Sequence, residues 1–264
     1  MSFQPIIPSS GLVGWKFLER TYEAQNAAFQ KSTVITRDTE YFAENISKVE
    51  TAEDLVNDRR LLRVALGAFG LGDDINNKYF VKKILEEGTI DDGALANRLA
   101  DDRYKELASS FGFDLGTPHT KISTFADDII GKFREQQFEV AVGEQDENMR
   151  MAMYTERSLG EIAVGDSTED TKWFKIMGTP ALREVFQTAF NLPSSFAQLD
   201  LDQQLGVFQD RATQYFGDDS VAQFAQPENQ EKLIRDFLVR SQISDFQATS
   251  AGNIALTLLQ SSNY

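Results

Sequence analysis

The chain contains a single histidine, His119, and no cysteine among its 264 residues. A Ser-His-Asp or Cys-His arrangement would require this histidine as its base, but the surrounding Gly-Thr-Pro-His-Thr stretch is typical of a surface turn. One histidine cannot build a multi-histidine metal site, and a chain without cysteine has no thiolate nucleophile and no sulfur-bound zinc. The sequence therefore predicts no catalytic residue, no metal site and no cofactor.

Paired aspartates could coordinate calcium or act in acid–base catalysis, and they recur along the chain. The doublets are Asp73-Asp74, Asp91-Asp92, Asp101-Asp102, Asp127-Asp128 and Asp218-Asp219. None has the spacing of a calcium-binding loop. Most fall at the starts of expected helices, where a negative charge gains about 0.3–1 kcal/mol from the helix dipole. We prefer this structural interpretation, but a glycosidase-type pair stays open because its separation depends on the tertiary structure.

The composition is acidic, with 41 Asp and Glu residues against 26 Lys and Arg residues, which gives a net charge of −15. Such a protein repels a phosphate backbone, so nucleic acid is not an expected partner. The first fifteen residues, MSFQPIIPSSGLVGW, lack the basic and apolar regions of a cleaved signal. No apolar run reaches the roughly 18 residues of a spanning helix. We expect a cytoplasmic protein without membrane insertion, and export without a cleaved signal stays open.

Apolar residues recur at spacings of three and four in almost every segment, which predicts an all-α fold. The clearest helix follows Asp200, where a single apolar stripe runs to a stop at Gly217. Thr179-Pro180 and Pro227 mark two further helix starts, and a last helix is expected around Ile254–Leu259. Earlier helices are expected near 11–30, 37–48, 52–69, 74–87, 93–111 and 122–162.

Three similar stretches end expected helices: Ala68–Leu71, Ser110–Phe113 and Ala189–Leu192. A helix often ends with Gly or Asn in the left-handed conformation, followed by an apolar residue that packs back onto the helix. Gly70, Gly112 and Asn191 match the left-handed position. We therefore interpret the repeated pattern as a way of ending helices.

A helix over residues 122–162 would be about 60 Å long, because each residue adds 1.5 Å. Polar residues at Gly143–Asn148 interrupt its apolar stripe, so a bend at Gly143 or a loop over 143–148 is the alternative. The expected architecture has helical bundle-like subdomains at 1–121 and 163–264, bridged by a long central helix at 122–162.

The polar interruption is also the candidate surface for a protein partner, because flexible methionines beside charges suit an adaptable interface. The candidate residues are Glu144, Asp146, Glu147, Met149 and Met153. The alternative is a solvated face in the middle of a helix. Five aromatic residues near expected helix ends could form another exposed patch, although core positions are favoured: Phe3, Trp15, Phe17, Trp173 and Phe174.

Four stretches carry a resemblance to a known family. They are GLVGWKFL (11–18), LLRVALGAFGL (61–71), FEVAVGEQ (138–145) and WFKIMGTPALR (173–183). The chain resembles the alphaproteobacterial family called domain of unknown function 1217, over nearly its whole length and including LDLDQQ (199–204). The resemblance implies an association with flagella, because members are commonly encoded among flagellar genes. It implies no catalytic or ligand-binding residue.

The first hypothesis is a non-enzymatic interaction or structural protein of the bacterial flagellar system, with a protein partner. One alternative is a helical glycan-cleaving hydrolase, which needs a cleft with two carboxylates about 5–10 Å apart. Another is a flagellar secretion chaperone, which needs a long apolar groove for a partner helix. The oligomeric state and the identity of the flagellar partner stay open.

Overall fold

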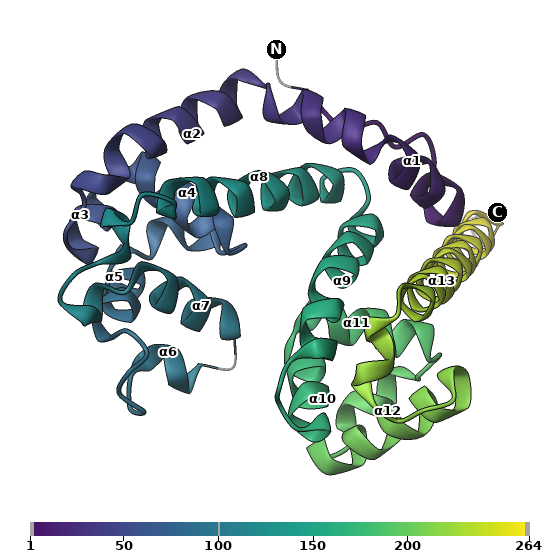
Figure 1. Cartoon of the computed structure of the whole chain (residues 1–264). Coiled ribbons are helices and arrows are strands. Elements are labelled where there is room, and N and C mark those ends of the chain that lie inside the picture. The colour runs from purple at the N-terminus through teal and green to yellow at the C-terminus, as the bar shows by residue number, and fades with distance from the viewer. Residues whose placement is uncertain (1–2, 100, 262–264) are drawn as a thin grey trace. The chain divides into compact units, whose positions relative to one another are not determined.

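The computed structural model describes residues 3–99 and 101–261, and this part of the chain is all-α, as predicted (Figure 1). The α-helices are α1 (Gly11–Gln30), α2 (Thr33–Asn45), α3 (Ala52–Asn57), α4 (Arg59–Ala68), α5 (Lys78–Glu87), α6 (Leu95–Arg98), α7 (Asp102–Phe111), α8 (Phe125–Gly143), α9 (Glu147–Val164), α10 (Glu169–Gly178), α11 (Pro180–Ala189), α12 (Leu201–Phe216) and α13 (Pro227–Ser261). Short 3-10 helices connect several of them: η1 (Ile46–Lys48), η2 (Gly72–Asn76), η3 (Phe113–Leu115), η4 (His119–Lys121), η5 (Ser194–Gln198) and η6 (Val221–Ala225).

The chain forms two compact units. Unit 1 comprises the described residues up to Ile6 together with Thr21–Ala141, and unit 2 comprises Ile7–Arg20 together with the described residues from Val142 onwards. The chain therefore passes between the units three times: after Ile6, within α1 after Arg20, and near the end of α8 after Ala141. The expected subdomain boundaries, 121/122 and 162/163, do not coincide with these junctions.

The prediction of a single central helix over 122–162 is wrong. α8 ends at Gly143 and α9 begins at Glu147, so Glu144–Asp146 form a turn. Asp146 has extended backbone angles and caps α9, because its carboxylate accepts a hydrogen bond from the Met149 N–H at 3.2 Å. The polar interruption is thus a short loop, which was the alternative interpretation.

Other expected helices are also divided by caps. The helix expected over 52–69 breaks at Asp58, whose carboxylate accepts hydrogen bonds from the N–H groups of Arg60 and Leu61 at 2.9 and 3.1 Å. The helix expected over 93–111 breaks before Asp102, and Asp101 caps α7. In contrast, the two helices expected after Pro227 are one helix, α13. The side chains of Ile254, Leu258 and Leu259 lie outside the described residues.

The predicted helix stops are confirmed. Gly70, Gly112 and Asn191 have φ angles of 68°, 60° and 52°, in the left-handed region. The N–H groups of Leu71 and Leu192 each donate back across the stop, to Leu66 O and Gln187 O at 2.9 Å. These bonds satisfy carbonyls that the end of a helix leaves without partners.

Gly70→Val and Gly112→Val are each expected to lower the free energy of unfolding by more than about 1 kcal/mol, because a β-branched residue is strained in the left-handed conformation. Urea denaturation of each variant and the parent measures the change. Asn191→Gly is the control and should leave stability unchanged or slightly higher, because glycine adopts this conformation freely. Parent-like stability of both valine variants would contradict the assignment.

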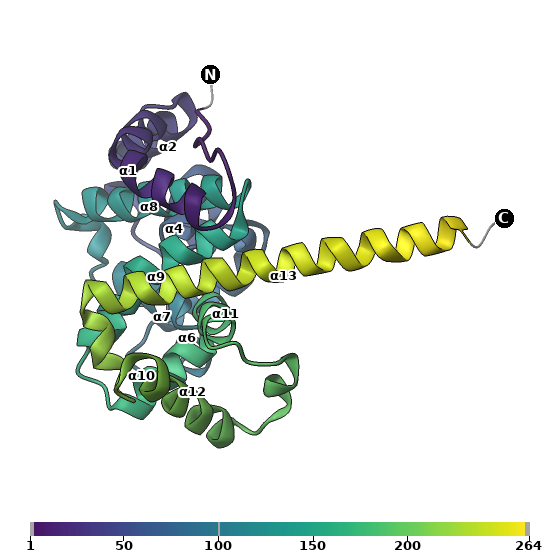
Figure 2. The same cartoon turned by 90° about the vertical axis from the view of Figure 1, so that its right-hand side faces the viewer.

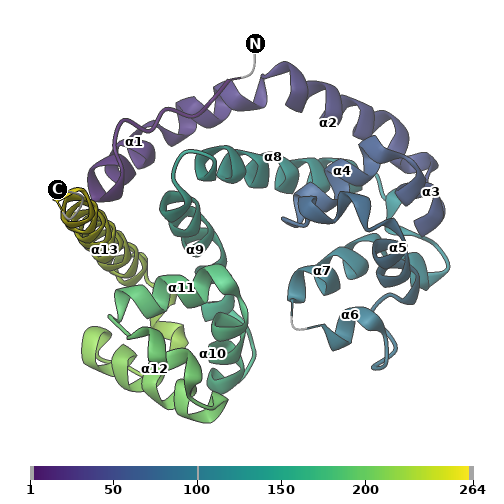
Figure 3. The same ribbon diagram turned by 180° about the vertical axis from the view of Figure 1, so that it is seen from behind.

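Each unit has its own core. In unit 1, α2 packs on α4, α3 packs on α4 and α5, and α5 packs on α7. The largest fully buried side chains there are Phe42, Phe111, Phe133 and Phe138. In unit 2, α13 packs on α9 and α11 (Figures 1 and 3). Its core is aromatic and contains Trp173, Phe186, Phe190, Phe208, Phe224 and Phe237.

Candidate functional site

The candidate partner surface of the α8–α9 turn is only partly at the surface. Met149 and Met153 are 0% and 8% exposed, so they belong to the core of unit 2 and cannot contact a partner. Their assignment to an interface is therefore wrong. Glu144 and Glu147 are exposed, and Asp146 is half-buried. The methionines repeat with the helical period because they face the core.

The acidic residues of this turn have local structural roles. Asp146 caps α9, and Glu147 forms an ion pair of 3.6 Å with Arg150 one turn later. Replacing Asp146 would remove a cap that is worth about 1 kcal/mol. Both contacts are expected wherever a helix starts at an exposed turn. The turn retains Glu144 and Glu147 as candidate partner residues, without a feature that selects a ligand.

His119 is the first residue of η4 and packs against the C-terminal end of α7. Its Nδ1 is 3.0 Å from the Ser110 carbonyl oxygen, and a Cβ added at Gly112 would lie 3.0 Å from its Cε1. The imidazole therefore packs against the left-handed helix stop and contacts a carbonyl at the helix end. This position gives the histidine a structural contact. Of the aromatic residues of the possible exposed patch, Trp15 and Trp173 are buried, and Phe3, Phe17 and Phe174 are half-buried.

A hollow of about 270 Å³ lies along the outer face of α5 and is lined by Tyr79, Lys82, Lys83, Glu86 and Glu87. Each glutamate pairs with the lysine four residues before it, at 3.6 Å. Both retaining and inverting glycosidases need at least one desolvated carboxylic acid. The carboxylates of Glu86 and Glu87 are instead paired with lysines and partly exposed. The hollow therefore gives no support to the hydrolase alternative.

The part of the chain that the structure describes lacks two further features. It contains no group of three or more His, Cys, Asp or Glu residues that could hold a metal ion. It also contains no helix with the length and apolar character that crossing a membrane requires.

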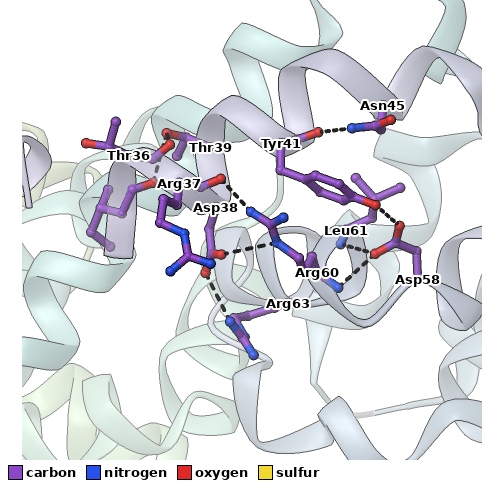
Figure 4. A network of polar contacts seen from close by, with 11 residues as sticks. Thr36, Arg37, Asp38, Thr39, Tyr41, Asn45, Asp58, Arg60, Leu61 and Arg63 are labelled. Carbon is purple, nitrogen blue, oxygen red and sulfur yellow. Dashed lines mark hydrogen bonds and ion pairs between the residues drawn. The ribbon is translucent and has the colours of Figure 1, made fainter. Parts of the chain in front are cut away.

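A polar network joins α2 to α4 in unit 1 (Figure 4). The nearly buried carboxylate of Asp38 lies 3.2 Å from Nη1 of Arg63 and 3.7 Å from Nε of Arg60. Arg60 also donates to the Arg37 carbonyl oxygen at 2.8 Å, and its guanidinium lies 3.9 Å from the centre of the Tyr41 ring. We call Arg37, Arg60 and Arg63 the arginine cluster. Its position is determined by the packing of α2 on α4.

The same network reaches the cap of α4. The Tyr41 hydroxyl donates to Asp58 Oδ2 at 2.7 Å. Burial acts to raise the pKa of the Asp58 carboxyl, but the hydrogen bonds from Tyr41 and from the N–H groups of Leu61 and Arg60 outweigh it and hold this pKa below its usual value. Asp58 is therefore ionised at neutral pH, and it anchors both the start of α4 and the ring on which Arg60 stacks.

Sequence reasoning missed the arginine cluster. The signal that could have found part of it is the run Arg59-Arg60 with Arg63, which is unusual in a chain of net charge −15. Arg37 and Asp38 carry no such signal, because only the tertiary structure brings α2 beside α4.

A row of exposed apolar side chains lies on α13. Val239, Ile243 and Phe246 are spaced by four and three residues, and their exposed fractions rise along the helix from 37% to 53% and 74%. The start of α1 reaches α13 at Gln242, since a Cβ added at Gly11 would lie 2.7 Å from Gln242 Oε1. Figure 2 shows α13 continuing past the other helices of unit 2. We call Val239, Ile243 and Phe246 the α13 row.

Comparisons with known proteins identify the family but no activity. The chain is similar to a crystal structure of a structural genomics target from Agrobacterium tumefaciens, with a TM-score of 0.74 and 27% sequence identity over 91% of this chain and 99% of that one. Comparison with curated proteins gives no match. The sequence model of the family DUF1217, described as a protein of unknown function, matches residues 68–247. The chain therefore belongs to the DUF1217 family of proteins of unknown function.

Proposed function

We propose that this protein is a non-enzymatic interaction component of the bacterial flagellar system and that the α13 row binds its protein partner. The observation that carries the proposal is the exposure of three apolar side chains at helical spacing, with Phe246 exposed to 74%. Amphipathic helices bind partners through side chains at this spacing, which lie on one face and enter an apolar groove. Burial of the row would contribute favourable free energy to an association.

The composition of the helix around the row supports a covered position. From Ser241 to the end of α13 at Ser261 the sequence contains a single charged residue, Asp245, whereas charged residues make up 25% of the chain. Helices that face water on one side normally place charged side chains there. The polar side chains of this stretch are almost all uncharged, so a protein partner that covers it would have to desolvate only one charge.

The flagellar part of the proposal rests on the resemblance described above, because members of the family are commonly encoded among flagellar genes. The non-enzymatic part is supported by the chemistry of the chain. It has no cysteine, and its one histidine contacts a helix end. A gene neighbourhood indicates a pathway and not a mechanism, so the proposal needs a test of motility and of binding.

We expect the double change Ile243→Ser and Phe246→Ser to reduce swimming to the level of a gene deletion while leaving thermal unfolding nearly unchanged, because exposed side chains contribute little to folding. The measurements are swimming-ring diameter in soft agar and melting followed by circular dichroism. Val164→Ser is the matched control, because Val164 is 70% exposed in the same unit but lies outside the row.

The protein should also be captured from cells with a partner that the double variant fails to retain. Parallel captures from export-competent and export-deficient cells would show whether the partner belongs to the secretion pathway. If the deletion strain swims normally, the flagellar assignment is wrong. If the deletion abolishes swimming but the double variant swims like the parent, only the assignment of the α13 row is wrong.

A further inference from the structure

We propose that the arginine cluster is a docking site for an acidic segment of a partner protein, with Arg37, Arg60 and Arg63 binding its carboxylates. The site lies in unit 1, away from the α13 row in the sequence, and it does not depend on the proposed function. Three features carry the inference: the fixed positions of two guanidinium groups, the donors they leave exposed, and the local sign of the charge.

Two guanidinium groups of the cluster are held in place before any ligand arrives. Asp38 lies between them, at 3.2 Å from Arg63 and 3.7 Å from Arg60. Arg60 is fixed further by the Tyr41 ring, 3.9 Å away, and by its bond to the Arg37 carbonyl oxygen. A long side chain that is already ordered loses less conformational entropy on binding, so the site is pre-organised.

The arginine cluster has hydrogen-bond donors that its contacts within the protein do not use. A guanidinium has five N–H donors, and the contacts with Asp38 and the Arg37 carbonyl use only some of them. The side chains of Arg60 and Arg63 remain 38% and 50% exposed. Arg37 is exposed, and its guanidinium has no hydrogen-bond or ion-pair partner within the described part of the chain. Figure 4 shows Arg60 and Arg63 joined to Asp38, with Arg37 beside Asp38 in the chain.

The local charge is opposite to that of the whole protein. The network holds three guanidinium groups and two carboxylates, Asp38 and Asp58, so it keeps a surplus of one positive charge on a chain of net charge −15. An acidic partner is repelled by most of this protein and attracted here. Complementary charge of this kind determines the orientation of a complex and excludes other faces.

The arrangement suits a segment better than a small anion. The three arginines project from two helices, and the hollow lined by Tyr79, Lys82 and Lys83 lies elsewhere, on α5. A single carboxylate or phosphate at an open surface engages few donors at once. A segment with several acidic side chains can form a bidentate pair with each guanidinium, which is the strongest arrangement for this group.

Titration of a fluorescently labelled hexaglutamate peptide with the full chain, followed by anisotropy at low ionic strength, tests the proposal. We expect saturable binding that weakens as salt is added, and no binding of hexaglutamine. Arg37→Gln should weaken binding at least about threefold, and Arg37→Gln with Arg63→Gln about tenfold or more. Arg235→Gln removes the same charge from an exposed site on α13 and should change binding less than about twofold.

Thermal unfolding of each variant checks its fold. If the change at Arg63 prevents folding, Arg37→Gln alone tests the proposal, because the structure gives the Arg37 guanidinium no partner to lose among the described residues. Absence of saturable binding by the parent would overturn the proposal, as would an equal effect of Arg235→Gln. Displacement of the peptide by millimolar inorganic phosphate would assign the site to a small anion. Self-association that Arg37→Gln abolishes would assign it to a second copy of the chain, and either result rejects the proposal.

Discussion

Replacing Trp173 by alanine is expected to lower the free energy of unfolding by about 3–5 kcal/mol. The indole is fully buried in unit 2, and its ring centre lies 5.6, 5.8 and 6.5 Å from those of Phe186, Phe208 and Phe224. Its Nε1 donates to the Asp219 carbonyl oxygen at 2.8 Å. Truncation would leave a cavity among aromatic rings and an unpaired carbonyl, and both effects favour the unfolded chain.

Urea denaturation followed by far-UV circular dichroism measures this loss of unfolding free energy. The signal does not depend on the fluorescence of Trp173, which the substitution removes. Trp173→Phe should have a smaller effect, because it keeps a ring in the cluster and loses mainly the hydrogen bond. Tyr79→Ala is the control for loss of an aromatic residue at the surface, since Tyr79 is 81% exposed, and it should change stability by less than about 0.5 kcal/mol. A Trp173→Ala variant as stable as Tyr79→Ala would show that the aromatic cluster is not the core of unit 2.

Gly14→Ala is expected to destabilise the protein by about 3 kcal/mol or more, at the upper end of the cost of overpacking. Gly14 lies in α1, where a Cβ would overlap the backbone carbonyl oxygen of Ser9 and lie 2.6 Å from Met149 Cε. A flexible side chain could move aside, but the carbonyl of Ser9 cannot move without its segment. The start of α1 would therefore have to shift from its place on α9.

Gly206→Ala is the matched control, because Gly206 lies within α12 and a Cβ there meets no atom within 4 Å. Alanine has a higher helix propensity than glycine, so this variant should be more stable by up to about 1 kcal/mol. The same denaturation experiment applied to both variants separates crowding from helix propensity. If Gly14→Ala is stabilised like Gly206→Ala, the packing of residues 7–20 in unit 2 is not as close as described.

The helical class and the helix stops were predictable because they depend on local chemistry. The spacing of apolar residues and the preference of Gly70, Gly112 and Asn191 for left-handed angles act over a few neighbouring residues. The breaks at Asp58 and Asp146 were harder to predict. An aspartate within a periodic stretch can cap a new helix or face solvent, and the difference depends on whether the chain turns there.

The candidate surfaces could be predicted only in part, because periodicity reveals a face and not what covers it. Met149 and Met153 repeat with the helical period whether they face a partner or their own core, and the structure places them in the core. The arginine cluster depends on Asp38, which lies more than twenty residues before Arg60. Predicting contacts between residues so far apart in the sequence requires knowing which helices pack together.

The assignment of residues 7–20 to unit 2 has a consequence for folding during synthesis. Trp15 and Leu18 are buried in unit 2, but the other part of that unit begins only at Val142, more than a hundred residues later. A ribosome that adds roughly 5–20 residues per second needs about 6–25 s to make the intervening chain. During this time unit 1 can acquire its helices from Thr21 onwards, while the first segment of unit 2 leaves the ribosome without the helices that cover it. Residues 7–20 can therefore reach their native contacts only after the chain from Val142 onwards has been made.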